Sequence, residues 1–341
     1  MAAEFSIAPV LEQYPGLGPI RRVYSLANAG GFSGAWLWRL EREAGDLCLR
    51  RWPQEHPTPE RLAFIHANLL QFALGGLTCI PLPMTCRSGQ TFVAWQGHLW
   101  ELTSWMPGRA DFLANPSRSR LASVMKTVAK LHRVAERNAE RIAIPPFGVS
   151  PTLLARHEQL SRLQAGEADE IAAAVRRFPS PPLQERGTRL LAHFRRRAPQ
   201  TEVKIKEAMK IKGIALFPVI RDLWHDHILF TDDQVTGIID FGAMRVDSAA
   251  CDLSRLLGSL VGNDQDAWLF ARESYSKIRP ISPAEWELVE ALDEAILILA
   301  GLNWLDWICV QGRTFEDYAA IYARLDEMLV RLEQPRSSSP A

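Results

Sequence analysis

The chain has 341 residues, and its 39 basic side chains (Lys and Arg) balance 39 acidic ones, so the formal net charge is zero. Hydrophobic residues make up 47% and charged residues 23% of the chain, proportions typical of a globular protein with a sizeable core. A nucleic-acid or anionic-membrane binder normally carries a basic excess, so the balanced charge argues against both classes. The longest nearly apolar stretch, residues 295–305, is about half of the roughly 20 residues that a membrane span needs.

The N-terminal segment and the cysteines predict a cytoplasmic location. The N-terminal segment lacks the basic start and the apolar core of a signal peptide. The five cysteines are scattered, their number is odd, and no Cys-x-x-Cys pair occurs. This pattern argues against a disulfide framework or a cysteine zinc site and favours a reducing compartment. Each cysteine is expected to be a small buried hydrophobic residue.

The first hundred residues are expected to form a small sheet with one helix. Alternating apolar and polar residues between glycine-containing turns favour strands. Apolar residues then recur at three- and four-residue steps, which favours a helix, and Thr58 is placed to cap it. The predicted strands are residues 22–27, 35–41, 47–52, 90–95 and 98–104, and the predicted helix is residues 57–74.

The rest of the chain is expected to be mostly helical, with a strand-like segment at residues 217–240. The predicted helices are residues 118–137, 153–177, 252–261, 283–308 and 314–332. We therefore predict an α+β fold with an N-terminal lobe at residues 1–103 and a helical lobe at residues 104–334. The Ser/Pro-rich tail at residues 335–341 is expected to be disordered.

The most informative segment is residues 221–242. A loop containing Asp222 leads into an apolar strand, a turn and a second apolar strand, which ends in Asp240-Phe241-Gly242. A hairpin of this kind returns the chain, so the two carboxylates are expected to lie side by side and face one pocket. Phosphoryl transfer needs such a pair, because one carboxylate orients the attacking hydroxyl and the other holds the Mg²⁺ that neutralises the nucleotide phosphates.

This segment resembles the aminoglycoside phosphotransferase/choline kinase family. Its members carry a loop of the type His-Gly-Asp-Leu-His/Trp-x-x-Asn, then Ile-Asp-Phe/Trp-Gly after a short hairpin, then Asp-Pro-x-x-Asp-Leu-Ala. The corresponding stretches here are residues 220–230, 239–242 and 247–254.

The resemblance implies a protein-kinase-like fold of two lobes, with an N-terminal antiparallel sheet. It further implies an ATP-dependent phosphotransferase that acts on a hydroxyl of a small molecule. In this interpretation Asp222 is the catalytic base and Asp240 is the principal Mg²⁺ ligand. Asp252 would be structural, bracing the catalytic loop by hydrogen bonds to its backbone.

Two residues depart from the family pattern. His227 stands where the family has the Asn that supplies a second metal contact, and imidazole suits transition metals better than Mg²⁺. It would bind the metal or hydrogen-bond a phosphate. Arg221 replaces the usual Gly. These changes leave a nucleotide-binding pseudokinase or interaction module without turnover as the alternative.

The residues 225–227, His-Asp-His, also allow a weaker hypothesis of a transition-metal hydrolase. Two imidazoles at positions i and i+2 of an extended segment would point the same way and could share a metal. The simpler interpretation is that His225 and Asp226 shape the catalytic loop.

The N-terminal lobe offers candidate phosphate ligands. Gly30, Gly31, Ser33 and Gly34 lie in a glycine-rich turn between two strands, where backbone amides can approach phosphate oxygens closely. Arg50 lies on the strand where kinase-like proteins place the phosphate-binding Lys, and its guanidinium group can bind phosphate bidentately.

Three further nucleotide-side residues are predicted. Glu60, the acid in the predicted helix, would pair with Arg50, although its position also suits a helix N-terminus. Backbone groups from Thr103 to Trp105, where a strand leaves for the helical region, would hydrogen-bond an adenine edge. Arg51 is expected to point to the opposite face of its strand, into solvent.

The acceptor is not readable from the sequence. Aminoglycosides, choline, homoserine and amino sugars are all handled by the family that the chain resembles. The helices after Asp252, where acceptor recognition is expected, carry no motif.

Overall fold

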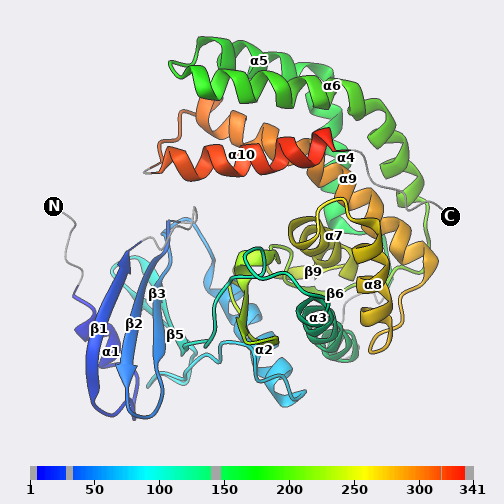
Figure 1. Cartoon of the computed structure of the whole chain (residues 1–341). Coiled ribbons are helices and arrows are strands. Elements are labelled where there is room, and N and C mark those ends of the chain that lie inside the picture. The colour runs from blue at the N-terminus through cyan, green and yellow to red at the C-terminus, as the bar shows by residue number, and fades with distance from the viewer. Residues whose placement is uncertain (1–5, 28–33, 140–146, 316, 335–341) are drawn as a thin grey trace. The chain divides into compact units, whose positions relative to one another are not determined.

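The computed structural model describes the chain except for residues 1–5, 28–33, 140–146, 316 and 335–341 (Figure 1). The chain folds as two compact units. The first unit comprises residues 1–138 and 225–244, and the second comprises residues 139–224 and 245–341. The glycines and serine at positions 30, 31 and 33 and the predicted tail therefore lie outside the described residues.

The first unit is built on a five-stranded antiparallel sheet. Its strands are β1 (Ile20–Ala27), β2 (Trp36–Arg42), β3 (Leu47–Arg51), β4 (Phe92–Trp95) and β5 (His98–Ser104), in the order β1-β2-β3-β5-β4. Leu47, Leu49 and Arg51 of β3 are buried, whereas Cys48 and Arg50 are half-buried. This period of two is the alternation expected of a strand, and it places Arg50 on the face opposite Leu49.

Helices and one hairpin complete the first unit. The helices are α1 (Ala8–Leu11), α2 (Pro59–Leu74) and α3 (Arg118–Ala139), and the hairpin joins β7 (Ile228–Thr231) to β8 (Gln234–Ile238). The Thr58 side chain accepts a hydrogen bond from the Arg61 N–H, so it caps α2 as predicted. The Val235 N–H donates a hydrogen bond to the Ser123 hydroxyl of α3, so the hairpin packs against this unit.

The second unit is mostly helical. Its helices are α4 (Pro151–Arg162), α5 (Ala168–Arg177), α6 (Pro181–Met209), α7 (Ala249–Leu260), α8 (Gln265–Ser276), α9 (Pro283–Leu305) and α10 (Tyr318–Glu333). Two short strands, β6 (Phe217–Val219) and β9 (Arg245–Asp247), pair antiparallel. Through this pairing β6 lies beside the chain that enters α7, which fixes the start of the loop that follows β6.

The predicted fold class is confirmed, and the differences have physical causes. The predicted helix at residues 153–177 is two helices, because Gly166 has φ +142° and interrupts the α-helical geometry. Helix α6 was not predicted, because Pro199 inside it and the prolines at its start disguise its periodicity. The first unit also extends beyond residue 103, since it includes α3 and the β7–β8 hairpin.

The prediction that Arg51 is solvated is wrong. Arg51 is 8% exposed, and its guanidinium group lies 5.7 Å from the centroid of the Trp36 ring. It occupies the inward side of β3 together with Leu47 and Leu49, so the strand buries an arginine on its apolar face. Its aromatic neighbour explains how the charge is tolerated there.

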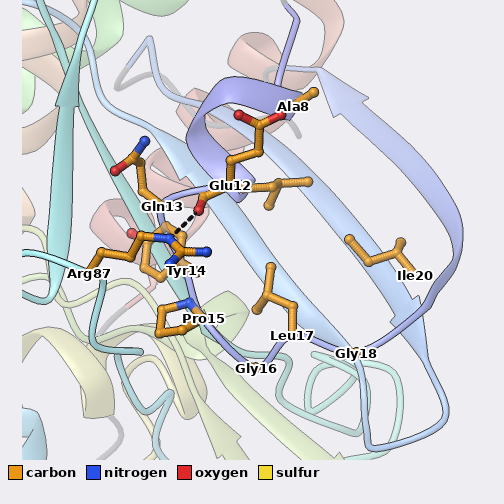
Figure 2. Close-up of a pocket in the computed structure, with 11 residues that line it drawn as sticks. Ala8, Glu12, Gln13, Tyr14, Pro15, Gly16, Leu17, Gly18, Ile20 and Arg87 are labelled. Atoms are coloured by element: carbon orange, nitrogen blue, oxygen red, sulfur yellow. Dashed lines mark hydrogen bonds between the residues drawn. The ribbon is translucent and has the colours of Figure 1, made fainter.

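Two further observations concern the surface. Within the described ranges, none of the helices combines the length and the apolar character that crossing a bilayer requires. An open groove of about 690 Å³ lies beside α1, and Figure 2 shows Arg87 at its edge, where Nε donates to the Glu12 carbonyl. Of the predicted site residues that the structure describes, none lines this groove.

Candidate active site

Asp240 is held at the end of the β7–β8 hairpin in the first unit. The Ile239 N–H donates to the His227 carbonyl over 3.0 Å, which brings the two segments together. Asp240 has φ +61°, a left-handed conformation that costs free energy for a non-glycine residue and is concentrated at functional sites. Its Oδ1 lies 3.3 Å from Nη1 of Arg50, and its Oδ2 lies 3.8 Å from Nε2 of His227.

The surroundings of Asp240 keep its carboxylate ionised. Burial alone would raise the pKa of Asp240, but the positive charge of Arg50, the nearby His227 and the Gly242 N–H together lower it below its ordinary value. An ionised carboxylate is the hard oxygen ligand that Mg²⁺ prefers, so Asp240 fits the role predicted for it. His227 lies beside it and fits a hydrogen-bonding role better than Mg²⁺ coordination.

The aromatic ring of Trp52 explains why glycine follows Phe241. A Cβ atom at Gly242 would lie 2.9 Å from the Trp52 ring, so any larger residue at position 242 would push the ring out of place. The guanidinium group of Arg50 lies 4.6 Å from the centroid of the same ring. Trp52 therefore packs against both Arg50 and the Asp-Phe-Gly turn and holds the two close.

Arg50 is clamped by acids on neighbouring segments. It faces Glu101 directly across the β3–β5 pair, with Nε 3.6 Å from Oε1 of Glu101, and contacts Asp240 at its other end. Glu101 also hydrogen-bonds His66 of α2 over 2.6 Å, and both side chains are buried. The ring of His66 is fixed in turn by Thr91, at 2.7 Å.

The predicted pairing of Glu60 with Arg50 is wrong. Glu60 is exposed in the first turn of α2, where hydrogen bonds from its own backbone N–H and from Thr58 lower the pKa of its carboxyl group. Arg50 takes Glu101 of β5 instead, and α2 contributes His66 to that pair rather than a carboxylate.

The predicted adenine-binding segment, residues 103–105, is hydrogen-bonded to neighbouring backbone segments. Thr103 is buried in β5 and pairs with Pro83. The N–H groups of Ser104 and Trp105 donate to the carbonyls of Leu82 and Asp46, both over 3.0 Å. These two donors are therefore already used.

Gly34 is the one residue of the predicted glycine turn within the described part of the chain. It has φ +73°, which glycine adopts without strain, and a Cβ there would lie 3.8 Å from Pro53. Gly30, Gly31 and Ser33 lie outside that part.

Asp222 lies in the second unit, in the loop after β6. Its Oδ1 lies 2.6 Å from Nη2 of Arg255, one turn beyond Asp252 on α7. Asp252 is fully buried, and its two oxygens accept hydrogen bonds from the N–H groups of Ile220 at 2.9 Å and Arg221 at 2.5 Å. The predicted bracing role of Asp252 is confirmed, and it holds Arg221 at φ +68° immediately before Asp222.

The residues 225–227 do not form the predicted extended segment. They form a turn of 3-10 helix, in which His225 pairs with Asp226 at 3.3 Å while His227 faces Asp240. Among the described residues, no group of three or more His, Cys, Asp or Glu side chains could hold a metal ion. The hypothesis of a shared transition-metal site therefore fails on geometry.

Three functional candidates escaped the sequence reasoning. Glu101 could have been found only from the β3–β5 register, which puts it opposite Arg50. His66 shares the buried face of α2 with Leu62 and Ile65, so its position resembles that of a core residue. Arg255 lies inside the segment that resembles the family, but nothing in that pattern singles it out.

Three features agree with a kinase-like phosphotransferase: an antiparallel sheet whose Arg50 contacts two carboxylates, an ionised carboxylate after a hairpin, and an acidic loop braced by Asp252 in the helical unit. A model of the phosphotransferase enzyme family matches residues 26–290. The chain belongs to this family, and the predicted activity, ATP-dependent phosphoryl transfer to a hydroxyl of a small molecule, is confirmed at that level.

Similar proteins agree with this assignment. A homoserine kinase of Methylocella silvestris is 26% identical over 317 residues, which cover 90% of this chain and 87% of that protein. An aminoglycoside phosphotransferase of Alicyclobacillus acidocaldarius has a TM-score of 0.65 at 16% identity, covering 97% of this chain and 98% of the other. A spectinomycin phosphotransferase in complex with ADP and spectinomycin has a TM-score of 0.64 at 10% identity, covering 95% of each. The two structures show the protein-kinase-like fold.

Replacing Asp252 tests the brace of the catalytic loop. Asp252→Ala leaves two buried N–H groups without an acceptor, so we expect the free energy of unfolding to fall by about 3–5 kcal/mol. Asp264→Ala, which removes an ordinary N-cap of α8, should cost only about 1 kcal/mol. Urea unfolding of both variants measures the difference, and equal losses would contradict the assigned role.

Replacing Glu101 tests the clamp on Arg50 through pH. Burial would raise the pKa of Glu101, but the hydrogen bond with His66 and the charge of Arg50 lower it. A lowered folded-state pKa contributes stability above the ordinary value of about 4.3 and loses it as the pH falls through the folded-state value. Glu101→Gln should therefore cost about 2–4 kcal/mol at pH 7, and the gap to wild type should narrow at pH below about 4.

The control for this measurement is Glu43→Gln, which removes an exposed ion pair with Arg21. It should change stability by less than about 1 kcal/mol at any pH. Urea midpoints from pH 7 to pH 3 give both profiles. A gap between Glu101→Gln and wild type that stays constant over this range would argue against a charged Glu101 as the source of the stability.

Proposed function

We propose that Asp222, Asp240 and Arg50 are the residues that carry out this phosphoryl transfer. The observation that carries the proposal is the ionised Asp240 carboxylate between Arg50 and His227. Positioning and charge neutralisation are the main sources of catalysis in phosphoryl transfer. Arg50 supplies a positive charge for the phosphates, and Asp240 supplies a negative charge for a metal ion. Arg50 would bind the nucleotide phosphates, because its guanidinium group is clamped and cannot lose its charge.

Asp222 would orient the acceptor hydroxyl and accept its proton. Its side chain is 40% exposed, which leaves it accessible to a substrate. The left-handed Arg221 and the buried Asp252 fix the backbone that presents it. Arg255 keeps the carboxylate paired and oriented, so its place in the loop is determined before an acceptor arrives.

Mg²⁺ would be held by Asp240 together with nucleotide phosphates. When bound, the ion neutralises the charge of the phosphates. The family Asn is His227 here, and we propose that His227 hydrogen-bonds Asp240 or a phosphate rather than coordinating Mg²⁺. Gly30, Gly31, Ser33 and Gly34 would cover the phosphates. Backbone groups near Thr103 and Trp105, other than the N–H groups of Ser104 and Trp105, would contact the adenine.

The acceptor would be a small hydroxylated metabolite. The relative from Methylocella silvestris is named a homoserine kinase, and it matches most of the length of both chains. This supports an amino-acid alcohol as the first acceptor to test. Aminoglycosides are the alternative suggested by the name of the Alicyclobacillus structure.

A cytoplasmic location is part of the proposal. All five cysteines carry free thiols, and three of them are buried. Burial raises the pKa of Cys48 to about 11, which disfavours the reactive thiolate. Thiols of this kind suit a reducing compartment, where ATP and small metabolites are also available.

A pseudokinase is the second candidate, and the observation that favours it is His227 in place of the metal-binding Asn. Such a protein would bind nucleotide but release no ADP. A titration with ATP in the presence and absence of Mg²⁺ or Mn²⁺, followed by an ADP-release screen across hydroxylated metabolites, separates the two. Binding without ADP release on any acceptor would favour the pseudokinase.

The roles of the two carboxylates are tested by their separate loss. Asp222→Asn should reduce phosphoryl transfer by at least about a hundredfold, because a general base typically contributes that much, while nucleotide affinity stays largely unchanged. Asp240→Ala should instead abolish the increase in nucleotide affinity that Mg²⁺ produces. Initial rates of ADP release and calorimetric titrations measure these effects.

Asp233→Asn is the matched control, since Asp233 lies between the two residues in sequence and is exposed in the turn of the β7–β8 hairpin. It should leave both rate and affinity close to wild type. Normal turnover of Asp222→Asn, or an intact Mg²⁺ effect in Asp240→Ala, would overturn the corresponding role.

A further inference from the structure

A cluster of arginines surrounds the loop of Asp222 in the second unit. Thr152, Arg156 and Gln159 lie on one face of α4, at positions i, i+4 and i+7. The Thr152 hydroxyl accepts a hydrogen bond from Nε of Arg221 at 3.2 Å, which brings the catalytic loop to this face. Arg255 of α7 adds a third guanidinium group through its ion pair with Asp222.

Two of these guanidinium groups have buried donors without an acceptor. The Nε atoms of Arg156 and Arg255 are both buried, and neither has a hydrogen-bond partner among the described residues. Arg156 donates from Nη1 to Oε1 of Gln159 over 3.1 Å, and within the described part of the chain it has no carboxylate partner. Unsatisfied buried donors are costly, so an acceptor from outside the chain is expected here.

The acids near the cluster are already engaged. Asp222 pairs with Arg255, and both oxygens of Asp252 accept from backbone N–H groups. Asp247 is fully buried and accepts from the hydroxyls of Ser150 and Thr152, with Nε of Arg221 3.8 Å away. Among the described residues, these three carboxylates are held by other groups and leave Arg156 without an ion pair.

The electrostatics of Arg156 agree with the lack of a carboxylate beside it. Its pKa is lowered, first by burial and then by the positive charges of Arg255 and Arg221. A cation that is buried beside two others is stabilised when an anion joins them. Gln159, which holds Arg156, is itself held by Asn303 of α9 through its Nε2, so the group is positioned in advance.

We propose that Arg156, together with Arg255, forms a binding site for a carboxylate carried by the acceptor. The acceptor is then a hydroxylated acid or amino acid whose hydroxyl reaches Asp222 while its carboxylate is bound by the two guanidinium groups. This inference rests on the proposed function, and it narrows the acceptor class by excluding polycationic acceptors such as aminoglycosides. The anion could also be a nucleotide phosphate, since a guanidinium group binds either, and the test separates the two sources.

The test compares L-homoserine with 3-amino-1-propanol, which has the same hydroxyl and amine but no carboxylate. Steady-state rates of ADP release are measured for wild type, Arg156→Gln, Arg156→Lys and the control Arg162→Gln. Arg162 lies on the same helix, is 58% exposed and pairs with Glu167. Calorimetric binding of both compounds, with a non-hydrolysable ATP analogue present, is measured in parallel.

We expect wild type to prefer L-homoserine by about tenfold or more in kcat/KM and in affinity, as for a charged hydrogen bond. Arg156→Gln should lower this preference to near one, mainly through the KM of L-homoserine. Arg156→Lys should restore part of it. The KM of ATP should stay unchanged in all variants, and Arg162→Gln should match wild type.

Equal use or equal binding of the two compounds by wild type would overturn the carboxylate site. A rise in the KM of ATP in Arg156→Gln would overturn it in favour of a phosphate. An equal loss in Arg162→Gln would show a general charge effect and overturn it as well. ADP release with acceptors that lack a carboxylate would then leave the proposed function standing, whereas no ADP release with any hydroxyl compound would end the proposed function itself.

Discussion

The candidate site in the first unit depends on one cation held between carboxylates, Arg50. The Arg50 side chain is only 17% exposed and its guanidinium group stays charged, so carboxylates on neighbouring segments are needed to stabilise it. Glu101 forms an ion pair with Arg50 across the sheet, and Asp240 forms another from the end of the hairpin. The same contacts keep both carboxylates ionised and hold the Asp-Phe-Gly turn close to β3. The ion pair between Arg50 and Asp240 therefore stabilises the fold and also keeps Asp240 in the charged form that a metal site needs.

In the second unit, the structure holds an exposed acid, Asp222, in a fixed position. Asp222 follows a left-handed Arg221, a conformation that an L-residue adopts only when its surroundings compensate. Asp252 stabilises this conformation by accepting hydrogen bonds from two backbone N–H groups, and Arg255 forms an ion pair with the carboxylate of Asp222. Beside this loop, Arg156 has a buried Nε without a hydrogen-bond partner among the described residues, and we propose that this guanidinium group binds the acceptor.

Much of this could be predicted from the sequence, and the exceptions share a cause. The strands and the candidates Asp222 and Asp240 follow from local patterns, and the role of Asp252 follows from the resemblance to the family. Glu101 and His66 escaped because their function depends on which strand lies beside β3, and neighbours in a sheet are not encoded locally. The prediction of Glu60 fails because the partner on α2 is a histidine, His66, rather than an acid. Helix α6 escaped because its prolines mask a periodicity that tertiary packing enforces.

The central claim is that clamped Arg50 binds the nucleotide phosphates. The most direct test is calorimetric affinity for ATP and for adenosine, measured in wild type and in Arg50→Met. The account predicts that the variant loses at least about tenfold in ATP affinity, the size of a charge-assisted contact, while adenosine binds as before. Unchanged affinity for ATP, or an equal loss for adenosine, would contradict it.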